Sequence, residues 1–195
     1  TQDILVENIA NYPRNEVAFL GDTAYKGITK LKTVENESRL LPLDVVFPVL
    51  HGTFGEDGTI QGLFEMSGIP YIGCGVLASA CGMDKVLMKT LFRDADLPQC
   101  EYVWFLRSEW EQNNNFVISQ VETKLGYPCF IKPANLGSSV GVTKATDIDS
   151  LRRGINLAAE YDRKIIVEEC LDMREIECVV MGNDEPLASL RGEYI

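Results

Sequence analysis

Apolar runs of strand length alternate in this sequence with segments whose apolar residues recur at the helical period. The predicted strands are 44–50, 71–72, 102–105, 129–132, 142–144, 165–168 and 176–181. The first predicted helix starts at Thr59, which can cap it, and ends before Gly68-Ile69-Pro70. Further helices are predicted at 76–81, 85–95, 116–125 and 150–161. Because this alternation is typical of layered mixed folds, we expect an α/β protein.

Composition excludes several classes of protein. The 195 residues are 46% hydrophobic and 24% charged, which is typical of a chain that buries a core. The net charge is −11 and Lys and Arg do not cluster, so we expect no nucleic-acid partner. The nearly uncharged stretch 67–83 is too short for a membrane span, so we expect no membrane partner either.

Cysteine spacing and the first residues bear on the cellular compartment. The six cysteines include no C-x-x-C pair, so we expect reduced thiols in the core and neither a zinc site nor a disulfide framework. Residues 1–12 resemble an amphipathic helix and carry no pattern of a secretory leader. We therefore expect a cytoplasmic protein.

The loop 133–141, with sequence PANLGSSVG, joins two predicted strands. Lys132 precedes it at the end of an apolar strand, and Pro133 restricts the backbone there. A lone strand-end lysine usually keeps its ammonium in water, and a Gly- and Ser-rich hairpin is usually a plain turn. Together, however, a lysine and successive backbone N–H groups favour a triphosphate site, in an order that differs from the strand-loop-helix of a Walker loop.

Acidic residues follow the strand 165–168. They are Glu168, Glu169, Asp172 and Glu175. Such carboxylates can accept hydrogen bonds from an adenine amine or a ribose hydroxyl, can form a solvated edge, or can attract Mg²⁺. Composition leaves these three alternatives open.

Two further side chains are candidates for function. His51 is the single histidine and ends a predicted buried strand, where open α/β sheets bind ligands, so a functional role is as well supported as a structural one. Lys85 begins a predicted helix, where a cation is unfavourable beside the helix dipole unless an anion shares the site. The position of Lys85 therefore indicates a bound phosphate.

Several motifs occur in a fixed order. They are HGTFGEDGTIQG from His51 to Gly62, MDK ending at Lys85, KPANLGSSVG from Lys132 to Gly141, VEE ending at Glu169, and REIE from Arg174 to Glu177. In this order and spacing the chain resembles the D-alanine–D-alanine ligase family of the ATP-grasp superfamily over 44–195. The resemblance implies an N-terminal parallel-sheet (pre-ATP-grasp) domain followed by an α+β ATP-grasp subdomain.

The resemblance also implies an activity. Members are ADP-forming ligases that join two D-alanines through an acyl phosphate for peptidoglycan synthesis, with ATP and Mg²⁺ or Mn²⁺, as cytoplasmic homodimers. The alternatives are a ligase that takes D-lactate or D-serine as second substrate, and a non-catalytic nucleotide-binding fragment. Met173 stands where the family usually has Gly.

Site residues are implied by position in the motifs. His51 would lie near the first D-alanine, and Ser138 would support the substrate through hydrogen bonds. Lys85 and Lys132 would hold ATP phosphates. The full set implied for ATP is Lys85, Lys132, Gly137, Ser138, Ser139, Val140, Glu168, Glu169, Leu171 and Glu175.

The resemblance divides the chain into three parts. We expect a substrate-side domain at 1–98 without its first strand, a central ATP-grasp subdomain at 99–181, and the start of a C-terminal subdomain at 182–195. The family's metal ligands, its mobile loop with a Tyr and its oxyanion-stabilising Arg would follow Ile195, so we assign no residue of this sequence to the metal.

Overall fold

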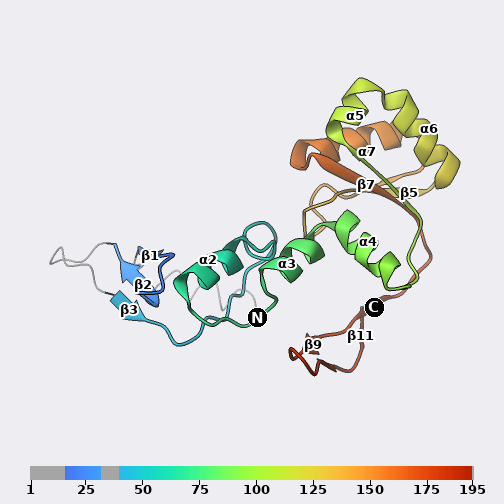
Figure 1. Ribbon diagram of the computed structural model, residues 1–195. Helices are drawn as coiled ribbons and strands as arrows, with labels where there is room; N and C mark the ends of the chain where they lie inside the picture. Colours follow the sequence, from blue (N-terminus) through green and yellow to red (C-terminus); the bar gives the residue numbers. More distant parts are fainter. Residues whose placement is uncertain (1–15, 32–39, 195) are drawn as a thin grey trace.

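The computed structural model describes residues 16–31 and 40–194. The helix expected within 1–12 lies outside them. The remaining chain is the mixed α/β protein expected (Figure 1). Its N-terminal part contains three short strands and three helices, which are β1 (Val17–Phe19), β2 (Gly27–Lys30), β3 (Leu40–Pro42), α2 (Thr59–Ser67), α3 (Val76–Met83) and α4 (Lys85–Asp94).

The pairing in this N-terminal part differs from the expectation. β1, β2 and β3 form an antiparallel sheet, and the only parallel pairing among the described residues is one bridge between Val46 and Tyr71. The strands predicted at 44–50 and 71–72 are therefore wrong as strands. A buried parallel strand needs hydrogen-bonded neighbours, but Pro48 has no N–H and Phe47 is 69% exposed.

Helix α2 also begins differently from the prediction. Gly58, not Thr59, is the N-cap, in a left-handed conformation with φ of 92°. The structure requires glycine there because a Cβ on Gly58 would lie 2.8 Å from the Val76 carbonyl oxygen. The predicted end at Gly68 is confirmed, and Phe64 is buried as the helical pattern indicated.

A second sheet forms the larger part of the molecule. Its strand order is β4-β7-β5-β6 and all its pairs are antiparallel. Three helices cover one face and α4 lies against the other (Figure 1). These elements are β4 (Tyr102–Leu106), α5 (Arg107–Gln112), α6 (Asn114–Lys124), β5 (Cys129–Pro133), β6 (Thr143–Ala145), α7 (Ile148–Tyr161) and β7 (Lys164–Glu169).

The core lies between this sheet and α6 and α7. Ile131 and Ile165 are fully buried there, because alternate residues of each strand face the helices, and Ile155 of α7 is buried in the same cluster. Asp147 caps α7 by accepting a hydrogen bond from the Ser150 N–H at 2.7 Å. The loop 133–141 joins the antiparallel strands β5 and β6, which confirms the predicted strand-loop-strand unit.

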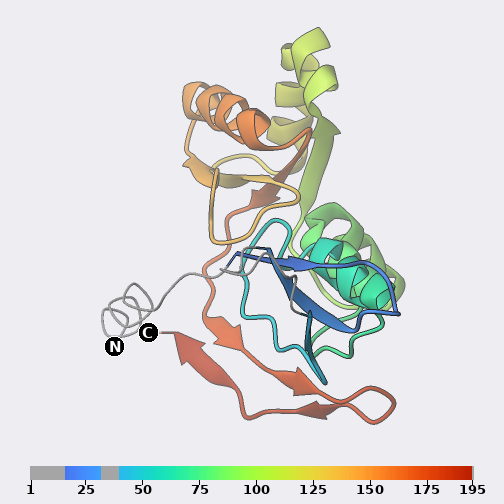
Figure 2. The ribbon, with the colours of Figure 1, turned by 90° about the vertical axis from the view of Figure 1, so that its left-hand side faces the viewer.

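The last part of the chain forms one long hairpin (Figure 2). β8 (Glu175–Glu177) pairs with β11 (Gly192–Tyr194), and β9 (Val180–Met181) pairs with β10 (Leu187–Ala188) nearer the turn. The strand predicted at 176–181 is therefore one arm of this hairpin, but it is interrupted at 178–179. Residues 171–193 are all exposed.

Two expectations about surface and core can be compared with the structure. No helix within residues 16–31 and 40–194 is long and apolar enough to cross a membrane. All six cysteines are free thiols, but only Cys129 among them is buried. The expectation of core thiols is wrong for Cys74 and Cys178, which are exposed on a loop and a hairpin.

Candidate functional site

A carboxylate between two ammonium groups lies where α4 packs on the sheet. Glu168 on β7 is 8% exposed. Its Oε2 is 2.5 Å from Lys132 Nζ and its Oε1 is 3.0 Å from Lys89 Nζ. Lys132 and Glu168 face α4 because they alternate along their strands with Ile131 and Val167, which face the core. The register makes them diagonal neighbours, since Glu168 pairs with Phe130 and Lys132 with Ile166.

A third lysine completes this cluster. Lys85 Nζ donates to the Leu136 carbonyl oxygen at 2.5 Å, which places the first residue of α4 beside the loop after β5. Burial and the nearby Lys132 ammonium lower the pKa of Lys85. Three ammonium groups, of Lys85, Lys89 and Lys132, lie near the carboxylate of Glu168, and Asp84 and Asp162 add negative charge near Lys85. Because Asp84 pairs with Lys164, four ammonium groups and three carboxylates leave a small positive excess, which favours an anion such as phosphate.

The ionised states of the paired groups follow from these contacts. Burial alone would raise the pKa of Glu168, but its hydrogen bonds with Lys132 and Lys89 hold that pKa below its ordinary value. Burial also opposes the charge on Lys89, yet the hydrogen bond to Glu168 raises the pKa of Lys89. The cluster is therefore ionic at neutral pH.

Other contacts fix α4 against the sheet. Asp84 is the N-cap of α4 and accepts hydrogen bonds from Val86 N–H and Leu87 N–H at 3.0 and 3.1 Å. Asp84 also pairs with Lys164 at the start of β7. The Lys85 N–H donates to the Ala134 carbonyl oxygen at 3.0 Å. The two lysines on α4 are consequently held in register with β5 and β7.

The loop after β5 has an unusual backbone. Ser138, Ser139 and Gly141 have positive φ angles of 51°, 56° and 71°. The loop contains a tight turn, in which the Val140 N–H donates to the Gly137 carbonyl oxygen at 3.2 Å. Positive φ at both central residues of a turn closed by this hydrogen bond is typical of the type I′ turns that connect hairpin strands. The backbone therefore fits the plain hairpin that the sequence also allowed, as well as a phosphate loop.

The segment that begins at His51 lies beside this loop. A Cβ built on Gly137 would lie 3.8 Å from the Gly52 Cα and 3.7 Å from Glu56 Oε2. Glu56 in turn accepts a hydrogen bond from the Gly52 N–H at 2.5 Å. His51 is exposed at the start of this segment. The structure therefore brings the HGTFGEDG segment and the PANLGSSVG loop together.

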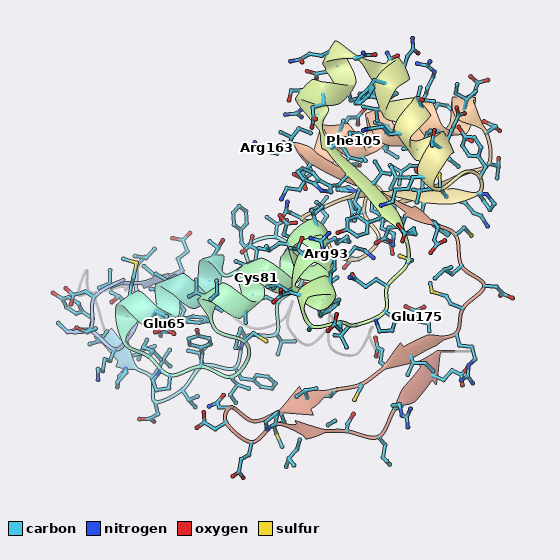
Figure 3. All side chains as sticks on the ribbon, turned by 45° about the vertical axis from the view of Figure 1, so that its right-hand side comes forward. Glu65, Cys81, Arg93, Phe105, Arg163 and Glu175 are labelled. Carbon is cyan, nitrogen blue, oxygen red and sulfur yellow. The ribbon has the colours of Figure 1, made fainter. Side chains whose placement is uncertain are left out.

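Some residues implied by the resemblance lie elsewhere. Glu169 Oε1 accepts a hydrogen bond from the Glu101 N–H at 2.8 Å. Leu171 is 48% exposed, and Glu175 begins β8 in the terminal hairpin, after the chain has left the sheet at Glu169 (Figure 3). The described residues contain no group of three or more His, Cys, Asp or Glu that could hold a metal ion. Glu168, Glu169, Asp172 and Glu175 are thus not assembled into such a group in the described structure.

Comparisons with known proteins identify the family. Residues 5–74 match the family described as D-ala D-ala ligase N-terminus, and residues 91–195 match D-ala D-ala ligase C-terminus. This chain belongs to the D-alanine–D-alanine ligase family. A D-alanine--D-alanine ligase from Heliobacterium modesticaldum is 54% identical over 92% of this chain and 48% of the relative, and one from Bacillus velezensis is 59% identical over 78% and 43%.

Solved structures of the family support the fold. A D-Ala:D-Ser ligase from Enterococcus faecalis has a TM-score of 0.83 and 36% identity, covering 99% of this chain and 54% of that one. The D-alanine-D-alanine ligase from Coxiella burnetii has a TM-score of 0.82 and 32% identity, with coverage of 100% and 54%. The ATP-grasp fold predicted from the sequence is thus confirmed. The chain spans about half the length of the ligases it matches.

Sequence reasoning missed Lys89 and Asp84 as members of the site. Lys89 lies four residues after Lys85, so both share one face of α4. That spacing is a usable signal, but it indicates the site only once α4 is known to pack on β7.

Proposed function

We propose that this chain supplies the nucleotide site of an ADP-forming D-alanine–D-alanine ligase. The observation that carries the proposal is the cluster of Lys85, Lys89 and Lys132 around Glu168, next to the left-handed loop at Ser138 and Ser139. Cationic side chains are what a triphosphate needs, because phosphoryl transfer depends chiefly on positioning and charge neutralisation. Membership of the ligase family supports the same assignment.

Each predicted residue has a role in this proposal. Lys132 and Lys85 bind ATP phosphates, and Glu168 accepts a hydrogen bond from the adenine amine. The loop from Gly137 to Gly141, including Ser139 and Val140, covers the phosphates. The backbone near Glu169 and Leu171 contacts the adenine ring, and Glu175 contacts the ribose. Residues 171–175 are exposed in the described structure.

The proposed reaction has two steps. A carboxylate oxygen of the first D-alanine attacks the γ-phosphorus of ATP, so that the bond to the β-γ bridging oxygen breaks and ADP leaves. The amine of the second D-alanine then attacks the acyl carbon, phosphate leaves, and the amine loses a proton as the peptide bond forms. Ser138 and His51 lie on the two adjacent loops and are the proposed contacts to D-alanine.

The divalent metal and the assembly are also part of the proposal. Mg²⁺ or Mn²⁺ would neutralise phosphate charge, but the described residues offer it no ligand set, so we assign it no residue of this chain. We further propose a cytoplasmic homodimer with a substrate-side domain at 1–98, a central ATP-grasp subdomain at 99–181 and a C-terminal subdomain that starts at 182.

A second candidate is a ligase that adds D-serine. It is a candidate because the D-Ala:D-Ser ligase from Enterococcus faecalis has the same fold, with a TM-score of 0.83 against 0.82 for the D-alanine-D-alanine ligase from Coxiella burnetii. D-Lactate as second substrate is a related candidate that changes the product from an amide to an ester.

The test is phosphate release by the full-length protein with ATP and Mg²⁺. We expect release that depends on D-alanine and yields D-alanyl-D-alanine. Parallel reactions with D-alanine plus D-serine or D-lactate identify the second substrate by product mass. Nucleotide binding without any release would contradict the ligase and leave a non-catalytic nucleotide-binding protein.

A further inference from the structure

Lys89 is less exposed than the other lysine that pairs with Glu168. It lies on α4 and its side chain is 9% exposed, whereas the Lys132 side chain is 27% exposed. The Lys89 ammonium contacts Glu168 Oε1 at 3.0 Å and Cys100 Sγ at 3.2 Å, and it lies 5.1 Å from the centre of the Tyr102 ring. Its hydrogen-bond donors and its charge are thus used inside the protein, so Lys89 is not placed to bind a ligand itself.

Glu168 has a different partner on each oxygen. Lys89 holds Oε1 from the buried side, and the more exposed Lys132 holds Oε2 at 2.5 Å. If Lys132 turns to a phosphate, Glu168 loses one of its two cations. A buried carboxylate without a cation costs free energy. Lys132 can therefore leave Glu168 at little cost only if Lys89 stays paired with it.

We propose that Lys89 is a positioning residue for nucleotide binding. It holds Glu168 through Oε1 and so frees Lys132 to bind phosphate. This inference rests on the proposed function, because it needs Lys132 to bind a nucleotide. Without Lys89, Lys132 is the only one of the two cations in direct contact with Glu168 that remains, so it is retained there and ATP must compete with that pair.

The test is a double-mutant cycle on ATP affinity in the full-length protein. We expect Lys89→Met to weaken ATP binding by about tenfold. In the Glu168→Gln background, which has no carboxylate to retain Lys132, we expect the same substitution to change affinity by less than about twofold. Lys89→Arg keeps the cation and is expected to restore most of the affinity.

A matched control separates this role from general loss of charge. Lys124 also lies over the Tyr102 ring, at 5.6 Å, but it pairs with Glu101 at 3.1 Å instead of Glu168. Lys124→Met should leave ATP affinity within about twofold of the wild type, because its exposed ion pair contributes little. Thermal unfolding of each variant shows whether it is folded, and Lys89→Gln replaces Lys89→Met if the latter does not fold.

The outcomes are distinct. Failure of the wild-type protein to bind ATP would contradict the proposed function itself. If the wild type binds ATP and folded Lys89→Met binds it equally well, Lys89 is merely structural and the inference is overturned. A loss of equal size in both backgrounds would also overturn it, since Lys89 would then act independently of Glu168.

Discussion

The sheet region, which consists of β4, β7, β5 and β6 with their covering helices, and the terminal hairpin hold their residues in different ways. In the sheet region, Ile131, Ile165 and Val167 are fully buried under two helices. In the terminal hairpin and the connector before it, every residue of 171–193 is exposed, and Val179 is 69% exposed. Residues on the sheet are therefore fixed by packing, whereas those in the hairpin are fixed chiefly by backbone pairing.

This difference explains which candidate residues form a site. Lys132 and Glu168 lie on strands whose alternate residues are in the core, so their side chains have defined partners. Leu171 and Glu175 lie in a segment without such support. In the described structure, a candidate side chain has defined partners where the residues next to it along the strand are buried, and membership of a motif alone does not give it such partners.

The largest expected effect concerns the core beneath the site. Ile165→Ala removes a fully buried side chain, so we expect a loss of about 2–5 kcal/mol in the free energy of unfolding. Ile176→Ala in β8 is the matched control. Ile176 is 44% exposed, and its loss should cost less than about 1 kcal/mol. Urea unfolding of both variants checks the prediction, and equal losses would contradict the contrast between the two regions.

A second pair of variants compares glycines in the two regions. At Gly141, φ is 71° and a Cβ would lie 2.8 Å from Pro133 Cγ, so Gly141→Ala should cost about 1–3 kcal/mol of unfolding free energy. At Gly192 no atom lies within 4 Å of the added Cβ, so Gly192→Ala should change stability by less than about 0.5 kcal/mol. A neutral Gly141→Ala would show that the loop does not need its left-handed backbone.

The smallest expected effect is on the dependence of stability on pH. Contacts with Lys132 and Lys89 hold the pKa of Glu168 below its ordinary value of 4.5, so the folded state binds fewer protons than the unfolded state at this group. Its contribution to stability is fully present above pH 4.5 and decreases as pH falls toward the folded pKa. Urea unfolding between pH 6 and pH 3 should show this decrease, and Glu168→Gln should remove part of it. An unchanged slope in Glu168→Gln would contradict the ion pairs.

The sheet region was largely predictable from the sequence. Long apolar runs and helical periods predicted β4, β7 and α7 to within a few residues, because these elements have a buried side that determines the pattern. β1, β2, β3 and α5 were not predicted, since strands of three or four residues and a six-residue helix have too few positions to show a period.

The candidate site was predictable in part. Lys132, Lys85 and the loop at Ser138 were recognisable because motif and backbone chemistry are local. Lys89 was not, because its role arises from the packing of α4 on β7 across 79 positions of the chain, from Lys89 to Glu168. Contacts of that kind depend on tertiary structure, which one sequence does not reveal.

The central claim is that the lysines facing Glu168 form a nucleotide site, and calorimetric titration of ATP into the full-length protein tests it most directly. Lys132→Met removes a charge-assisted phosphate contact worth about 1.5–3 kcal/mol, so we expect ATP affinity to fall by about 10- to 150-fold. The control is Lys144→Met, since Lys144 and Lys132 lie over the same Phe130 ring at 5.7 and 6.0 Å but Lys144 is exposed on β6. A large loss in Lys132→Met alone supports the account, whereas unchanged affinity in that variant would contradict it.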